Sequence, residues 1–174
     1  MTAHRHPGKR LAAWVIDWCL ILVWAGILAA VAVPFSLTGD LHALTTVWGN
    51  LLSAIVLVVP VTLAFAGLES SRHAATIGKR ALHLRVTDSA GARIGFARAL
   101  GRNALKIALP WLIGHSAVYE IVATSVQAQP PAWVWVLTAA AYLLPIAWIV
   151  SLFVGAGRTP YDRATGTAVR SISR

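Results

Sequence analysis

Four apolar runs, separated by short or basic segments, dominate the 174-residue chain. A helix needs roughly 20 apolar residues to cross a bilayer. The third run is the weakest because it contains His115 and Glu120. We therefore expect an all-α membrane protein, a bundle of four transmembrane helices that forms one domain over residues 1–174. The predicted helices span approximately residues 11–35, 47–68, 107–126 and 132–154.

The segment between the second and third runs, residues 69–106, is too long for a simple connection. Apolar and polar residues alternate over Leu82–Thr87, a pattern typical of a β-strand. Asp88–Gly91 follows as a turn, and residues 92–95 could form a short return strand. The sequence therefore predicts a small β-hairpin within this loop.

The last part of the same loop, Phe96–Lys106, predicts an amphipathic helix. Arg98, Arg102 and Lys106 recur every four residues and form one cationic stripe. Such a helix can lie in the headgroup plane, where anionic lipid attracts it. The stripe can therefore face water and lipid, or it can bind a specific partner or ligand.

Composition and charge support a membrane protein. The chain is 57% hydrophobic and 12% charged, whereas soluble domains carry about 25% charged residues. A net charge of +9 can indicate a nucleic-acid-binding protein, but that function requires a basic face on a soluble domain. Here the bases flank apolar runs, so we expect no nucleic-acid partner. Cys19 has no second cysteine with which to form an intrachain disulfide.

The distribution of Lys and Arg predicts the topology. All fifteen lie before the first run, in residues 69–106 or after the fourth run. The loops around Asp40 and over 123–131 contain none. Basic residues gather on the cytoplasmic side of membrane proteins. We therefore expect a multi-pass protein of the bacterial plasma membrane, with both termini and the long loop in the cytoplasm.

Asp17 is the most informative polar residue, because it lies inside the first apolar run. It follows Arg10 by seven residues, so the two share a helix face about 10 Å apart along the axis. A charge at the centre of a membrane helix costs roughly 2.5–3.5 kcal/mol, so Asp17 should face protein. Three interpretations remain open: a buried ion pair that orients the helices, a carboxylate that handles protons or cations, or a water-exposed acid.

Asp162 follows the fourth run and should lie at about the depth of Arg10, so a bidentate pair between them is reasonable. Asp17 lies deeper and needs another donor. The candidates, if the long loop folds back under the bundle, are Lys79, Arg80, Arg102 and Asn103.

Catalytic and metal-binding patterns are not apparent in the sequence. His115 and Glu120 are five residues apart and do not share a helix face, which makes them a poor metal pair. We find no Ser/His/Asp arrangement and no phosphate-binding loop. We therefore expect a non-enzymatic protein with no metal and no cofactor.

Four motifs occur in order along the chain, namely KRLAAWVID at 9–17, TIGKRALHLRV at 76–86, ALGRN at 99–103 and YDRATGT at 161–167. Together they resemble the RDD family of bacterial membrane proteins, which is named for one arginine and two aspartates. The resemblance implies that Arg10, Asp17 and Asp162 are the family-signature charges, although Tyr161 stands where a histidine often precedes the last aspartate.

The resemblance implies little chemistry, because most family members have no assigned function. We expect a non-catalytic structural, assembly or stress-related membrane factor. The alternative is a cation/proton antiporter that uses Asp17 as its ion- or proton-binding carboxylate, since an RDD-type protein has been linked to sodium/proton antiport. The expected partners are the bilayer, anionic lipid at the cytoplasmic face, and a second copy of the chain or another membrane protein.

Overall fold

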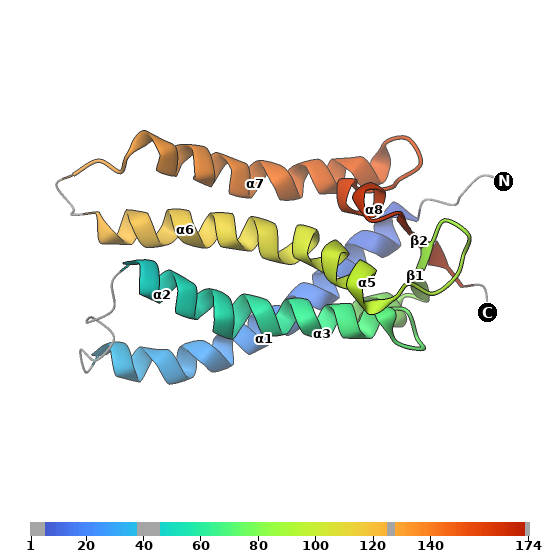
Figure 1. Ribbon diagram of the computed structural model, residues 1–174, viewed down its shortest axis with the longest axis horizontal. Coiled ribbons are helices and arrows are strands. Elements are labelled where there is room, and N and C mark those ends of the chain that lie inside the picture. The colour runs from blue at the N-terminus through green and yellow to red at the C-terminus, as the bar shows by residue number, and fades with distance from the viewer. Residues whose placement is uncertain (1–5, 38–45, 125–127, 173–174) are drawn as a thin grey trace.

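The computed structural model describes residues 6–37, 46–124 and 128–172, and most of them are helical. The elements form long rods that run side by side, with a small sheet at one end (Figure 1). In chain order they are α1 (Pro7–Leu37), α2 (Thr46–Ser53), η1 (Ala54–Val58), α3 (Val59–Ser70), α4 (Ile77–Ala81), β1 (Leu84–Asp88), α5 (Phe96–Asn103), η2 (Ala104–Ala108), α6 (Leu109–Ala123), α7 (Ala132–Phe153), α8 (Pro160–Ala164) and β2 (Thr167–Ser171).

Among the described residues, three helical stretches are long and apolar enough to cross a membrane, namely Pro7–Pro34, Val47–Ser70 and Ala132–Phe153. Large apolar side chains on these helices are exposed, for example Val23 at 62% and Val136 at 67%. Soluble proteins avoid such extensive apolar surface. The surface therefore fits a lipid environment.

The third predicted span differs from its prediction. Its helix begins at Phe96 rather than near residue 107, because α5 continues through η2 into α6. By itself α6 has only 15 residues, which is too short for the same membrane criterion. Residues 125 and 126 of the predicted segment lie outside the described part of the chain. Of the four predicted membrane-spanning helices, the structure therefore supports the first, the second and the fourth.

Two π-helical turns interrupt the rods, and each ends just before a proline. The turn η1 precedes Pro60 and η2 precedes Pro110. Proline has no N–H and its ring clashes with the carbonyl four residues earlier, so a wider turn relieves the crowding. Such π turns are frequent at functional sites, and η2 contains Lys106.

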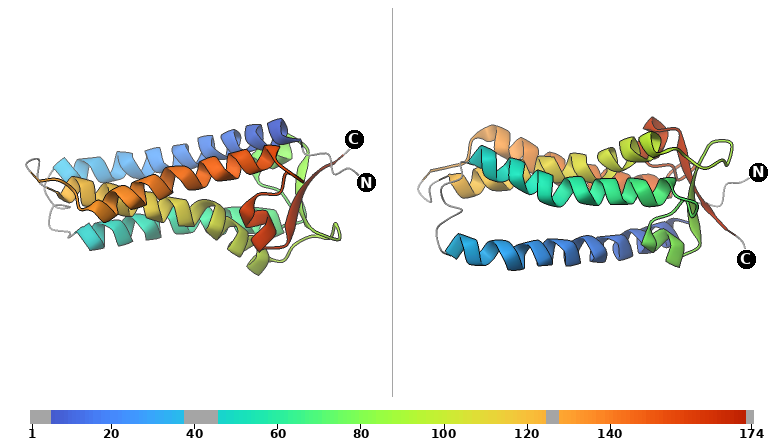
Figure 2. Two further views of the ribbon diagram at one scale, coloured as in Figure 1. Left: turned by 90° about the horizontal axis from the view of Figure 1, so that it is seen from above. Right: turned by 60° about the horizontal axis from the view of Figure 1, so that its bottom comes forward.

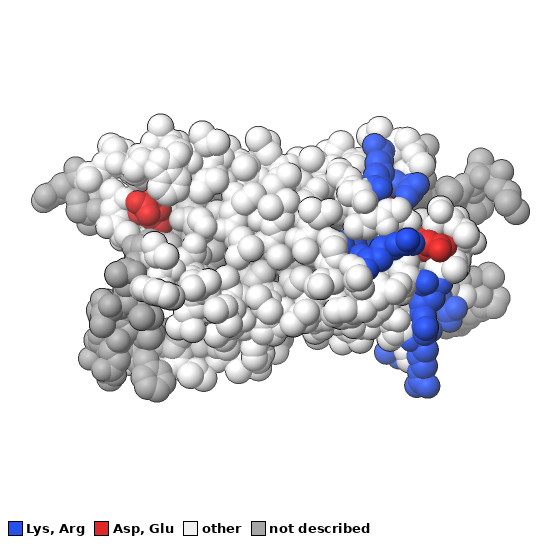
Figure 3. Space-filling model, viewed as in Figure 1, with Lys and Arg blue, Asp and Glu red and all other residues white. Residues whose placement is uncertain are grey.

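The charged residues lie mainly at one end of the molecule. Lys and Arg cover the surface around α5, α8 and the sheet, while the middle of the rods is uncharged (Figure 3). The same end holds the beginning of α1 and the two strands (Figures 1 and 2). We call it the basic end. Residues 69–106, the beginning of α1 and strand β2 therefore lie at one end of the fold (Figures 1 and 2).

The predicted β-hairpin is wrong. Strand β1 pairs antiparallel with β2, with Val86 opposite Val169, and only an isolated bridge joins Thr87 to Arg93. The predicted turn after Asp88 is present, since Gly91 donates to the Asp88 carbonyl. Thr87 pairs with Ala168 of β2 as well as with Arg93, so these two neighbours lie on opposite edges of β1. The chain after the turn enters α5 at Phe96 before a return strand forms.

Two small apolar clusters hold the elements together. One lies between the rods and contains Ile21, Phe65 and Ile107. The other lies under the sheet, where Val86 packs with residues of α3 and α5. The second cluster fixes the loop beneath the helices and so positions the polar residues of the basic end.

Candidate functional site

Asp17 is buried where α4 packs against α1. Its two carboxylate oxygens accept hydrogen bonds from the Thr76 hydroxyl, at 2.7 Å, and from the Gly78 backbone N–H, at 2.9 Å. Thr76 is also the N-cap of α4, so Asp17 lies at the start of that helix, which favours negative charge. Only 2% of the residue is exposed.

Gly78 allows this close approach of α4 to α1. A Cβ atom at residue 78 would lie 2.1 Å from the Ala13 carbonyl oxygen and 3.0 Å from Asp17 Oδ1. The cationic donors predicted for Asp17 do not form its hydrogen bonds among the described residues. A hydroxyl and a backbone amide take that role, which residue type alone cannot reveal because any residue carries the amide.

Asp162 is held by two arginines and by its own helix. Arg10 Nη2 lies 2.6 Å from Oδ2, and Arg102 Nε and Nη2 contact Oδ1 at 3.0 and 2.9 Å. Thr159 and Asp162 form a capping box at the start of α8. The predicted contact between Arg10 and Asp162 is present, but it is not bidentate, because the other arm of Arg10 binds the Gly157 carbonyl.

Glu69, at the end of α3, is the acidic residue that sequence reasoning missed. It is fully buried. Its carboxylate accepts from Lys79 at 2.6 Å, from Arg102 at 2.7 Å and from Asn103 at 2.9 Å. A signal was present in the sequence: a lone acid ends the second apolar run, directly before a loop rich in bases.

Three of the four supporting residues predicted from sequence thus lie in the site, although they bind Glu69 rather than Asp17. Arg80 is exposed and lies outside it. The interpretation of Arg102 and Lys106 as a stripe facing water and lipid is also wrong, because both are buried. We call the following seven residues the charge cluster: Arg10, Asp17, Glu69, Lys79, Arg102, Lys106 and Asp162.

Burial and ion pairs shift the pKa values of Asp162, Lys79 and Arg102. Burial raises the pKa of Asp162, but Arg102 and Arg10 outweigh it and bring the value to about 2. Burial lowers the pKa of Lys79 to about 8, although Glu69 opposes the change. Burial also lowers the pKa of Arg102, but Glu69 and Asp162 raise it to a net value above normal. Asp162 and Arg102 therefore stay charged at neutral pH.

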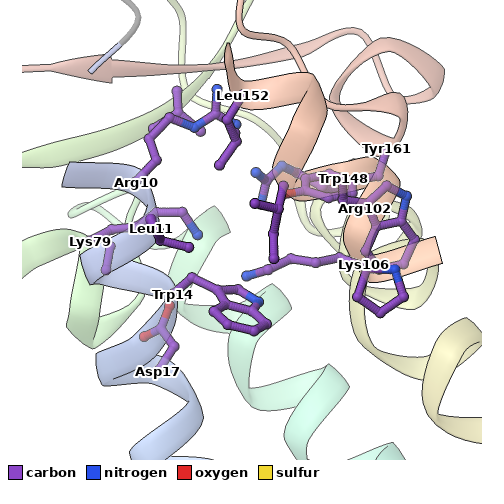
Figure 4. A pocket seen from close by; sticks show the side chains of 14 residues that line it. Arg10, Leu11, Trp14, Asp17, Lys79, Arg102, Lys106, Trp148, Leu152 and Tyr161 are labelled. Atoms are coloured by element: carbon purple, nitrogen blue, oxygen red, sulfur yellow. The ribbon is translucent and has the colours of Figure 1, made fainter. Parts of the chain in front are cut away.

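Lys106 is the one basic member of the charge cluster that forms no ion pair among the described residues. Among the described residues, no carboxylate oxygen lies within 4 Å of its amino group. Its amino group lies over the ring of Phe65, with 5.7 Å between Nζ and the ring centroid. Figure 4 shows its side chain reaching from η2 toward Lys79 and Trp14 across a pocket. Only 8% of the residue is exposed.

The pocket, which we call the cluster pocket, has a volume of about 50 Å³. Four basic side chains line it, those of Arg10, Lys79, Arg102 and Lys106, against the single carboxylate of Asp17. Glu69 and Asp162 bind these bases but do not line the pocket, so the whole cluster has four basic and three acidic residues. Its charge suits an anion better than a cation.

The fold and the site together define a membrane protein with apolar helices and a buried charge cluster at one end. The chain belongs to the RDD family, whose model matches residues 5–124. The match includes every member of the charge cluster except Asp162. No curated protein matches the chain, and no solved structure matches it.

Proposed function

We propose that this chain is a four-span protein of the bacterial plasma membrane that acts without catalysis, as a structural, assembly or stress-related membrane factor. The charge cluster is the observation that carries the proposal. Arg102 joins Glu69 of α3 to Asp162 of α8, and Asp162 in turn binds Arg10 of α1. The signature charges are therefore used to hold helices together at the basic end.

In this proposal both termini and residues 69–106 lie in the cytoplasm. The positive-inside rule supports this orientation. The third span would be the apolar part of the rod, Ile107–Ala123, whose 17 residues reach the lower limit for crossing a bilayer. The polar beginning of that rod, α5, would then stay at the cytoplasmic side with Arg102.

Cation/proton antiport is the second candidate, because Asp17 lines the cluster pocket. A volume of about 50 Å³ holds several water molecules, so a proton could reach the carboxylate. Two observations disfavour this function. Both oxygens of Asp17 already accept hydrogen bonds, and the four bases of the pocket repel sodium.

The two functions differ in everted membrane vesicles. We expect no sodium-dependent proton movement, measured by fluorescence dequenching, for the wild-type chain or for Asp17→Asn. Asp17→Asn should instead lower the amount of folded protein, because it removes a carboxylate that holds α4. Robust dequenching by sodium that requires Asp17, at equal protein abundance, would establish the antiporter and overturn the proposal.

A further inference from the structure

We propose that the cluster pocket and the groove next to it bind an anionic phospholipid, with its phosphate on Lys106 and an acyl chain between α1, α6 and α7. The inference goes beyond the proposed function, because it names a ligand. It uses the proposed orientation only to place the lipid in the cytoplasmic leaflet.

The groove has a volume of about 540 Å³ and is lined mainly by apolar and aromatic side chains of α1, α6 and α7. It is continuous with the cluster pocket, since Trp14, Lys106, Pro145 and Trp148 line both. Along α6 it extends as far as Ile121. Fifteen residues of helix span about 22 Å. This length exceeds the roughly 15 Å depth of one leaflet, so an acyl chain has room to lie in the groove.

Lys106 supplies the charge complement at the junction of groove and pocket. A buried ammonium without a counterion is costly, and its ring contact with Phe65 offsets only part of that cost. A phosphate at this position would give Lys106 an ion pair. It would also neutralise the single excess positive charge of the cluster. The bases around it disfavour a zwitterionic headgroup, whose own cation would lie beside Arg10 and Lys79.

Trp111 is a second unsatisfied donor in the groove. Its indole N–H is buried and has no hydrogen-bond partner among the described residues. The ring is fixed by stacking on Trp18, with 5.4 Å between centroids. It lies five residues after Lys106, so a lipid with its phosphate on Lys106 would bring its ester carbonyls toward this N–H. A free inorganic anion would leave both the N–H and the apolar groove unused.

Lipid binding can be measured on the full chain purified in lipid-free detergent micelles. We would titrate it with phosphatidylglycerol or with phosphatidylcholine of the same acyl chains. Bound lipid is counted by native mass spectrometry, and the thermal unfolding midpoint is recorded in parallel. We expect one phosphatidylglycerol to bind and to raise the midpoint, with phosphatidylcholine at least tenfold weaker. Glycerol phosphate, which lacks acyl chains, should leave the midpoint unchanged.

Three variants test the assignment of the residues. Lys106→Gln should weaken phosphatidylglycerol binding on the order of tenfold to a hundredfold, since a charge-assisted hydrogen bond is lost. Lys106→Arg should retain most of the binding. Lys9→Gln is the matched control, because it removes an exposed base at the same end. Without lipid, Lys106→Gln should be at least as stable as the wild type, because it removes an unpaired buried charge.

The proposal fails if Lys106→Gln binds phosphatidylglycerol like the wild type, or if phosphatidylcholine binds equally well. A midpoint shift by glycerol phosphate equal to that by the lipid would identify a small-anion site instead. If Lys106→Gln does not fold, Trp111→Phe decides: it should weaken lipid binding severalfold, and unchanged binding would overturn the assignment. The antiport measurement does not depend on these results, so the two proposals can fail separately.

Discussion

At the scale of single residues, Arg102 connects distant parts of the chain through one side chain. Its guanidinium contacts both oxygens of Glu69 and one oxygen of Asp162, and it lies over the ring of Tyr161 at 5.1 Å. A planar fork with five donors can satisfy two carboxylates and an aromatic face at once, whereas a lysine ammonium cannot. This geometry explains why a fully buried arginine is tolerated at the centre of the charge cluster.

Replacement of Glu69 by glutamine tests how much the cluster stabilises the fold. Glu69→Gln keeps the shape but leaves Lys79 and Arg102 with less compensation in a buried site. Removal of one partner of a buried ion pair typically costs 3–5 kcal/mol. We expect a loss of about 3 kcal/mol, measured by denaturant or thermal unfolding in micelles. Glu120→Gln, at the far end of α6, is the matched control and should stay within about 0.5 kcal/mol of the wild type.

The pKa of Asp162 predicts acid sensitivity. Its value of about 2 lies below the ordinary 3.8, so the folded state binds fewer protons than the unfolded state between these pH values. The stabilisation is complete above about pH 4 and is lost as the pH falls through 2. It amounts to about 2 kcal/mol. Asp162→Asn should therefore unfold with a flatter pH dependence than the wild type from pH 4 to 2.

At the scale of elements, the contact between α1 and α4 depends on the missing side chain of Gly78. Gly78→Ala would place a methyl group against the Ala13 carbonyl and displace the N–H that binds Asp17. Overpacking of this kind usually costs 1–3 kcal/mol, and loss of the buried hydrogen bond adds to it. We expect roughly 3 kcal/mol of destabilisation and a lower folded yield in membranes.

A second glycine of the same helix pair provides the control. A Cβ atom on Gly26 of α1 would meet no atom within 4 Å, and alanine favours helix more than glycine. Gly26→Ala should therefore be neutral or slightly stabilising in the same unfolding measurement. Equal effects of the two substitutions would show that the packing of α4 on α1 does not matter.

The elements also show what could be predicted from sequence. The first, second and fourth apolar runs are confirmed because the bilayer criterion is local and depends on composition. The pairing of β1 with β2 joins distant residues, for example Val86 with Val169, and alternation in Leu82–Thr87 carries no information about its partner. Glu69 was missed for a similar reason: its role depends on which bases the folded loop brings to the end of α3.

A contact within the site could be predicted from the sequence where two residues must lie at the same depth in the membrane. Arg10 and Asp162 had to lie at one level, and they are in contact. The donors of Asp17 could not be predicted, because one is a backbone amide made accessible by Gly78. The predicted stripe of Arg98, Arg102 and Lys106 does not share one environment. Arg102 is buried between Glu69 and Asp162, Lys106 is buried over the ring of Phe65, and Arg98 is exposed.

At the scale of the whole molecule, charge is separated along the long axis. The basic end holds the charge cluster, the sheet and the beginning of α1, while the end of α6 and the beginning of α7 lie at the opposite end (Figure 1). The loops predicted to face outward contain no Lys or Arg. Because basic segments are retained in the cytoplasm, this separation of charge should decide the orientation in which the bundle inserts into the membrane.

Reporter fusions test that orientation for the complete chain. Alkaline phosphatase is active only outside the cytoplasm, so we expect it to be inactive after Arg174 and active when inserted after Gln129, between α6 and α7. A fluorescent protein that folds only in the cytoplasm should give the opposite pattern at the two positions. Because the phosphatase is inserted within the full chain, α7 is still present, and the result cannot arise from a truncated bundle. If α6 were too short to cross, the chain would make three crossings, and phosphatase after Arg174 would be active. The two reporters at Arg174 therefore distinguish four crossings from three and test whether the 17 residues Ile107–Ala123 suffice as a span.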